Sequence, residues 1–175
     1  MPIILIVAVV AIAAYAIYNN TAQADTGSSS SDGGDNVQND GSGSALADTR
    51  GFRNNNPGNL VYILLNPFNG QIGKDGAYAV YDTISNGVRA LGKQLDNYVV
   101  RDNLTTVQDI ITKWAPPSEN DTQAYIVDVA NRLGVAVDQP LAWPSEKPDL
   151  VAAIIQHENG VQPLATDDII TYINS

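Results

Sequence analysis

The chain has 175 residues, of which 44% are hydrophobic and 16% charged, with no cysteine, one histidine and a net charge of −10. This length accommodates one ordinary domain plus accessory segments. The missing cysteines exclude disulfides and thiolate metal sites, a single histidine excludes multi-histidine zinc centres, and we expect neither a metal nor a cofactor. With 19 acidic residues against 9 basic ones, the chain also lacks the basic stripe that binding to nucleic acid requires.

The first segment, residues 2–18, contains no charged or strongly polar side chain. As a helix it would span about 25 Å, close to the ~30 Å of a bilayer core, and Tyr15 and Tyr18 fall where aromatic rings favour the interface. Residues 1–18 are therefore predicted to form a transmembrane anchor. The alternative is a cleaved leader peptide, for which residues 22–24 offer a small-x-small site, although no Lys or Arg precedes the apolar run.

The second segment, residues 19–48, consists mostly of Gly, Ser, Asp and Asn. It has too few apolar residues to offset the entropy lost on ordering, so we predict a flexible acidic linker. Thirty such residues have a root-mean-square span of about 30 Å. The remaining residues, 49–175, hold all nine basic residues and fourteen of the acidic ones, and they are predicted to form one domain.

Within this domain, residues 61–64 and 78–81 favour short strands around a Gly-rich hairpin. Apolar residues then recur at helical spacing from Ile84 to Tyr98. A second helix, capped by Thr105 or Thr106, must stop before the proline pair at residues 116 and 117.

Two helices and a short final one follow. The first is capped by Ser118 or Asp121 and ends at Gly134, the next runs from Pro148 to Gly160, and Thr166 opens the last. The predicted fold class is therefore mainly α (α+β), a helical domain with a small β element.

Glutamate is scarce in the domain, which contains only Glu119, Glu146 and Glu158. The first two lie in connections, where solvated or capping roles are expected. Glu158 continues the apolar stripe of Val151 and Ile155 at a helix C-terminus, where burial and the helix dipole both disfavour a charged carboxyl. Cleavage of a glycosidic bond needs a protonated acid, so Glu158 is the predicted catalytic residue. The structural alternative is a carboxylate at the edge of the stripe, paired with Arg or Lys.

A second candidate cluster is the asparagine-rich turn at residues 53–60. Consecutive asparagines before Pro-Gly form turns, and their amides also suit sugar hydroxyls and N-acetyl groups. Aromatic side chains elsewhere in the domain offer faces on which a sugar can stack. The residues predicted to bind substrate are Asn54, Asn55, Asn56, Asn59, Tyr78, Tyr125, His157 and Asn159.

Four blocks of the sequence resemble a family of phage and prophage proteins described as virion structural or peptidoglycan-degrading lytic proteins of the lysozyme-like class. They occur in the family's order and lie within residues 51–163. The resemblance implies a lysozyme-like muralytic domain at residues 49–175. The blocks are GFRNNNPGNL at 51–60, YAVYDT with GVRAL at 78–91, WAPPSENDT at 114–122 and HENG at 157–160.

Two of these regions also look like segments of lytic transglycosylases. Residues 153–163 resemble the I-x-x-E-S-G-x-N-P helix end that carries their catalytic Glu, and residues 117–129 resemble their later P-E-T-x-x-Y-V-x-x-V segment. Because the Glu helix comes first in those enzymes and last here, the resemblance implies a permuted connectivity, in which residues 54–59 face Glu158 across a cleft. A separation above about 12 Å would contradict this arrangement.

The function predicted from these features is a membrane-anchored phage virion enzyme that cleaves the glycan strand of peptidoglycan during genome delivery or lysis, as a lytic transglycosylase or a muramidase. A hydrolase would need a partner acid, for which Asp82 is the first candidate. The expected partners are peptidoglycan, a lipid bilayer at residues 2–18 and other virion proteins. The expected location is a virion membrane or the bacterial inner membrane, with the domain facing the cell wall.

Two alternatives remain. The first is a non-catalytic virion structural or cell-wall-binding protein, and the second is a secreted bacterial effector with a cleaved leader.

Overall fold

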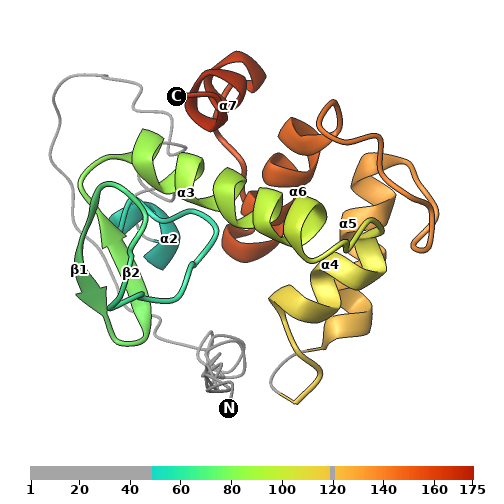
Figure 1. The fold of residues 1–175 in the computed structure, drawn as a ribbon, viewed down its shortest axis with the longest axis horizontal. Helices are drawn as coiled ribbons and strands as arrows, with labels where there is room; N and C mark the ends of the chain where they lie inside the picture. The colour runs from blue at the N-terminus through green and yellow to red at the C-terminus, as the bar shows by residue number, and fades with distance from the viewer. Residues whose placement is uncertain (1–48, 119–120) are drawn as a thin grey trace, which may run out of the picture.

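The computed structural model describes residues 49–118 and 121–175. The predicted anchor and linker, as well as Glu119, lie outside the described residues. No helix among the described residues is long and apolar enough to cross a membrane. The elements are α2 (Arg50–Arg53), β1 (Gln71–Asp75), β2 (Tyr78–Tyr81), α3 (Ile84–Asp96), the π-helical turn η2 (Asn97–Arg101), α4 (Val107–Trp114), α5 (Thr122–Leu133), α6 (Lys147–Asn159) and α7 (Thr166–Ile173) (Figure 1). The prediction of a mainly helical domain with a small β element is confirmed.

The helix boundaries follow from local capping. Thr106 accepts a hydrogen bond from the backbone N–H of Asp109 and so caps α4, whereas Asp121 caps α5 through the N–H of Ala124. Each side chain satisfies a donor that the first turn leaves unpaired. At the other ends, α5 and α6 stop at Gly134 and Gly160, both with φ of 71°, as a glycine in the left-handed conformation allows.

The β element differs from the prediction, because residues 61–64 form no strand. The partner of β2 is β1, and Val61 makes only an isolated bridge to Tyr78. The antiparallel hairpin turns at Gly76, whose φ of 61° suits glycine in a two-residue turn. The run at 61–64 lacks a core to face, since Leu64 and the adjacent Leu65 are 76% and 77% exposed. The turn at Asp75 and Gly76 therefore determined which segment pairs with β2, and the apolar run at residues 61–64 did not.

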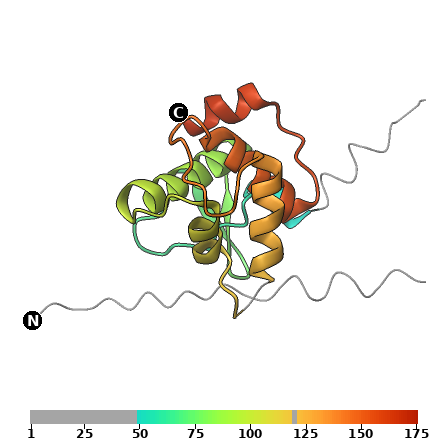
Figure 2. The ribbon, with the colours of Figure 1, turned by 90° about the vertical axis from the view of Figure 1, so that its right-hand side faces the viewer.

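Helix α6 lies at the centre of the domain and contacts α2, α3, α5 and α7. Its buried face includes Leu150, Val151, Ile154 and Ile155, all with 0% exposure. In Figure 1 the hairpin and α2 lie on one side of this centre, and α4 and α5 lie on the other. Helix α7 lies at the top of the domain in both Figure 1 and the side view of Figure 2. The C-terminal end of α6 therefore lies between two groups of elements.

The asparagine turn at residues 54–59 packs closely on α3. A Cβ atom added to Gly87 would lie 1.7 Å from the carbonyl oxygen of Asn55, and one added to Gly58 would lie 3.0 Å from the Leu91 side chain. Only a helix position without a side chain allows a backbone carbonyl to approach so closely. Gly87 thus fixes the turn against α3.

We predict that Gly87→Ala destabilises the domain by at least about 2 kcal/mol, because the added methyl group must displace backbone. Thermal unfolding of the full-length protein by circular dichroism measures this loss. Gly73→Ala in β1 is the matched control, since nothing lies within 4 Å of its added Cβ, and its stability should stay within about 1 kcal/mol of the parent. Equal stability of both variants would contradict the close packing.

Candidate functional site

The last turn of α6 carries Glu158 out of the core to a half-buried position. The neighbouring Asn159 fixes this turn, because its Nδ2 donates to the carbonyl oxygen of Pro57 at 2.7 Å and its Oδ1 accepts from Thr49 Oγ1 at 3.0 Å. Thr49 immediately precedes α2, and Pro57 belongs to the asparagine turn. The end of α6 is thereby tied to the segment that contains Asn59.

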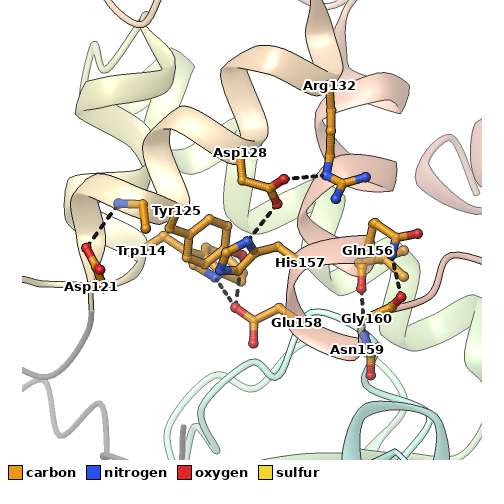
Figure 3. Close-up of polar contacts among 12 residues, drawn as sticks. Trp114, Asp121, Tyr125, Asp128, Arg132, Gln156, His157, Glu158, Asn159 and Gly160 are labelled. Atoms are coloured by element: carbon orange, nitrogen blue, oxygen red, sulfur yellow. Dashed lines mark hydrogen bonds and ion pairs between the residues drawn. The ribbon is translucent and has the colours of Figure 1, made fainter.

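Glu158 accepts three hydrogen bonds from three different parts of the fold. Its Oε1 accepts from Tyr125 Oη of α5 at 2.9 Å and from Trp114 Nε1 of α4 at 3.3 Å, as Figure 3 shows. Its Oε2 accepts from Asn59 Nδ2 at 3.0 Å. The predicted proximity of Glu158 to the asparagine turn, within about 12 Å, is confirmed. No Arg or Lys pairs with Glu158 in the residues that the structure describes.

The two oxygens of Glu158 are not equivalent. A carboxylate oxygen has two lone pairs, and Oε1 uses both on the donors Tyr125 and Trp114. Oε2 uses one on Asn59 and has no second donor among the described residues. The open position on Glu158, for a proton or for the hydroxyl of a ligand, therefore lies on Oε2.

Tyr125 is a permanent donor to this carboxylate. Burial first, and then the negative charge of Glu158, raise the pKa of the Tyr125 hydroxyl well above its ordinary value. The phenol therefore stays protonated at any physiological pH. The second donor, Trp114, is held by an edge-to-face contact with Tyr98, at 6.3 Å between ring centroids.

His157 lies beside the carboxylate without a direct bond to it among the described contacts. Its ring stacks on Tyr125 at 3.5 Å between centroids, and its Nδ1 lies 2.8 Å from Asp128 Oδ2. Asp128 also accepts from Arg132 Nε at 3.0 Å. Burial raises the pKa of Asp128, but the hydrogen bonds from Arg132 and His157 outweigh burial, and the net pKa lies below its ordinary value. Asp128 is thus an ionised carboxylate that orients His157.

Like Asn159, three predicted substrate-binding asparagines of the turn use their amides inside the protein. Asn54 Nδ2 donates to Asp75 Oδ2 at 3.1 Å, and Asn55 Nδ2 donates to the Tyr81 carbonyl at 3.0 Å. Asn56, with 0% exposure, donates to the carbonyls of residues 60 and 79 and accepts from the N–H of residue 60, each at 2.9 Å. These amides hold the turn on the β1–β2 hairpin, and Asn59 is the asparagine of this turn that the structure bonds to Glu158.

The structure also places the other predicted residues. Tyr78 lies on β2 beneath the guanidinium of Arg50, at 5.0 Å from its ring centroid. Asp82 is exposed at the start of α3, where its Oδ1 accepts from Asn86 Nδ2 at 2.6 Å. This hydrogen bond lowers the pKa of Asp82 below its ordinary value, so its carboxylate is ionised at neutral pH.

Sequence reasoning missed Asp128 and Arg132. Tyr125, Asp128 and Arg132 follow one another at steps of three and four on α5, which places them on one helix face. That spacing could have joined both residues to Tyr125. Among the described residues, no cluster of three His, Asp or Glu side chains has a geometry that could hold a metal ion.

Fold and site together define a mainly helical domain with a central carboxylate bound by neutral donors. No protein-family model matches the chain. The chain is 35% identical over 134 residues to Protein P5 of Pseudoalteromonas phage PM2, an alignment that covers 69% of this chain and 77% of that protein. The chain therefore belongs to the family of this phage protein.

We predict that Asp128→Asn lowers the free energy of unfolding by about 1 kcal/mol at pH 6, in the range of partly exposed ion pairs. Because the folded pKa of Asp128 is depressed, its contribution is present above the unfolded value of about 3.9 and disappears as pH falls through the folded pKa. Urea unfolding at pH 6 and pH 3 should show a smaller difference between the two proteins at pH 3 than at pH 6. The control is Asp138→Asn, an exposed carboxylate that should behave as the parent at both pH values.

Proposed function

We propose that residues 49–175 form a lysozyme-like domain that cleaves the glycan strand of peptidoglycan, as a lytic transglycosylase or a muramidase. The observation that carries the proposal is Glu158, a carboxyl with one open position on Oε2 beside the Asn59 amide and the Tyr125 and Trp114 rings. Membership in a phage protein family supports a role in the virion. Within the virion, residues 1–18 would anchor the protein in a membrane and residues 19–48 would extend the domain toward the cell wall.

The proposed chemistry uses Oε2 twice. Protonated Glu158 gives its proton to the glycosidic oxygen as the bond from that oxygen to the anomeric carbon breaks. In a transglycosylase the carboxylate then takes the proton of the sugar's own 6-hydroxyl, whose oxygen bonds to the anomeric carbon. The proton returns to Oε2, so no second carboxylate is required. Throughout, Tyr125 and Trp114 hold Oε1, and Asn59 keeps its hydrogen bond to Oε2.

A muramidase needs a second group to activate water or to stabilise the sugar cation. Asp82 remains the proposed partner, and its ionised carboxylate suits a base. A transglycosylase is the simpler of the two reactions, because it needs no second carboxylate.

The proposed permuted connectivity has one supporting contact. Tyr125 belongs to the block that looks like the later transglycosylase segment, and Glu158 belongs to the block that looks like the catalytic one. Their hydrogen bond of 2.9 Å brings the two blocks together, although their order along the chain is reversed.

A second candidate function is non-catalytic binding to the cell wall within the virion. The observation that favours it is the number of protein donors on Glu158, since a carboxylate that accepts three internal hydrogen bonds is also suited to a structural role. The two functions differ in turnover, which a single substitution tests.

We predict that Glu158→Gln lowers the rate of peptidoglycan cleavage by about 10²-fold or more, because an amide is not acidic enough to transfer a proton to the glycosidic oxygen. Full-length protein in mild detergent is incubated with purified sacculi, and the soluble fragments are quantified. The fold should persist, because the Asn59 amide can rotate and turn its Oδ1, a buried atom that lacks a hydrogen bond among the described residues, toward the introduced N–H group.

The control is Asp138→Asn, which should clear sacculi as the parent does. Equal clearing by Glu158→Gln would remove Glu158 from the mechanism. Sacculus binding by the parent without clearing would favour the non-catalytic function. Fragments that gain no reducing end would identify a transglycosylase, and new reducing ends would identify a hydrolase.

We also predict that the full-length protein stays with the membrane pellet after alkaline carbonate extraction, because burying each CH₂ group of residues 2–18 contributes about 0.8 kcal/mol. Immunoblotting of pellet and supernatant measures the outcome. A variant without residues 2–18 is the control and should be released. Release of the full-length protein as well would contradict the proposed anchor and favour the leader peptide.

A further inference from the structure

A hollow between α5 and α6 lies apart from the Glu158 carboxyl. Its volume is about 510 Å³, which is within the range of small-molecule sites. We name it the α5–α6 hollow. Its polar lining comes from Arg132, Asp149, Gln156 and Gln162, and Leu133 and Ala153 contribute apolar surface.

The two charges of this hollow are not neutralised by each other. Arg132 comes from the last turn of α5 and Asp149 from the first turn of α6. Both line the hollow, yet no ion pair joins them in the part of the chain that the structure describes. A cation and an anion that face one cavity without meeting leave room for a ligand with both charges.

Hydrogen-bonding capacity remains on the same side chains. Arg132 donates through Nε to Asp128, and its two terminal NH₂ groups have no partner within the described residues. Gln156 donates through Nε2 to the Gly160 carbonyl at 2.5 Å, which leaves its Oε1 as an acceptor. The Arg132 donors suit a carboxylate in bidentate geometry, and the acceptors of Asp149 and Gln156 suit an ammonium group.

We infer that the α5–α6 hollow binds an amino-acid centre that carries a free carboxylate and a free amino group. Arg132 binds the carboxylate, and Asp149 together with Gln156 Oε1 binds the amino group. Resting on the proposed function, this ligand is the diamino-acid end of a peptidoglycan stem peptide. A simple anion would be repelled by Asp149, and a neutral sugar would bring no opposite charge to either Arg132 or Asp149.

The hollow is joined to the carboxylate by a chain of contacts visible in Figure 3. Arg132 bonds Asp128, and Asp128 bonds His157. His157 stacks on Tyr125, which donates to Glu158. A ligand held by Arg132 would therefore be connected to Glu158 through Asp128, His157 and Tyr125.

The experiment titrates the tripeptide L-Ala–γ-D-Glu–meso-diaminopimelate into the full-length protein in detergent, by calorimetry and by amide chemical shifts. We expect saturable binding, with shifts concentrated at residues 149–156 and 132–133. Acetylating the distal amino group or amidating the distal carboxylate should each weaken binding by at least about tenfold, because each removes a charge-assisted contact.

Variants of the lining should reproduce this loss. Arg132→Gln and Asp149→Asn should each weaken binding of the parent tripeptide about tenfold. Ala152→Leu, which adds a larger side chain to the lining, should do the same if the ligand lies there. The control is Asp138→Asn, an exposed carboxylate outside the lining, which should bind as the parent does. Equal affinity in the three lining variants, or no saturable binding of the tripeptide, would overturn the inference.

Failure of this inference is separable from failure of the proposed function. The protein could cleave peptide-free glycan strands in a reaction that depends on Glu158 and yet fail to bind the tripeptide. This result would support the proposed function and contradict peptide binding in the hollow. The protein could instead bind the tripeptide in a way that depends on Arg132 and yet cleave no strand. This result would support peptide binding in the hollow and contradict the proposed enzymatic activity.

Discussion

The site depends on the buried side chain of Asn56. Its amide closes three hydrogen bonds to the backbone of residues 60 and 79, and leaving such groups unpaired would cost about 1–3 kcal/mol each. These bonds fix the asparagine turn on β2, while Gly87 admits its carbonyl against α3. Asn159 ties the same segment to the last turn of α6. Because the asparagine turn and the last turn of α6 are both held in place, the short Asn59 side chain lies within hydrogen-bonding distance of Glu158.

The electrostatic character of the site comes from the choice of donors. Glu158 is surrounded by a phenol, an indole and an amide, none of which carries a charge. An Arg partner would form an ion pair with the carboxylate, whereas these three donors bind it without adding a positive charge to the site. The open lone pair on Oε2 then allows a proton to be carried without breaking any of the three hydrogen bonds. The charged side chains on the same face of α5, Asp128 and Arg132, form an ion pair with each other and not with Glu158.

Helix α5 connects the different parts of this face. It supplies Tyr125 to the carboxylate, Asp128 to His157 and Arg132 to the α5–α6 hollow. These residues share one side of the helix, so a movement of α5 against α6 would change the carboxylate and the hollow together. The proposed glycan cleavage and the inferred peptide binding would thus both depend on the position of α5.

The sequence by itself predicted helices α3 to α7 and most of their ends, although not α2 or η2, and it singled out Glu158. Periodicity and capping act over a few residues, so Thr106, Asp121 and Gly160 could be interpreted without knowing the fold. Tertiary structure decided the rest. The partner of β2, the internal use of the Asn54–Asn56 amides and the roles of Asp128 and Arg132 were not predicted. The contacts of Glu158 span 33, 44 and 99 residues of sequence, and local patterns do not specify which distant donors a carboxylate will meet, because that choice belongs to the packing of whole helices.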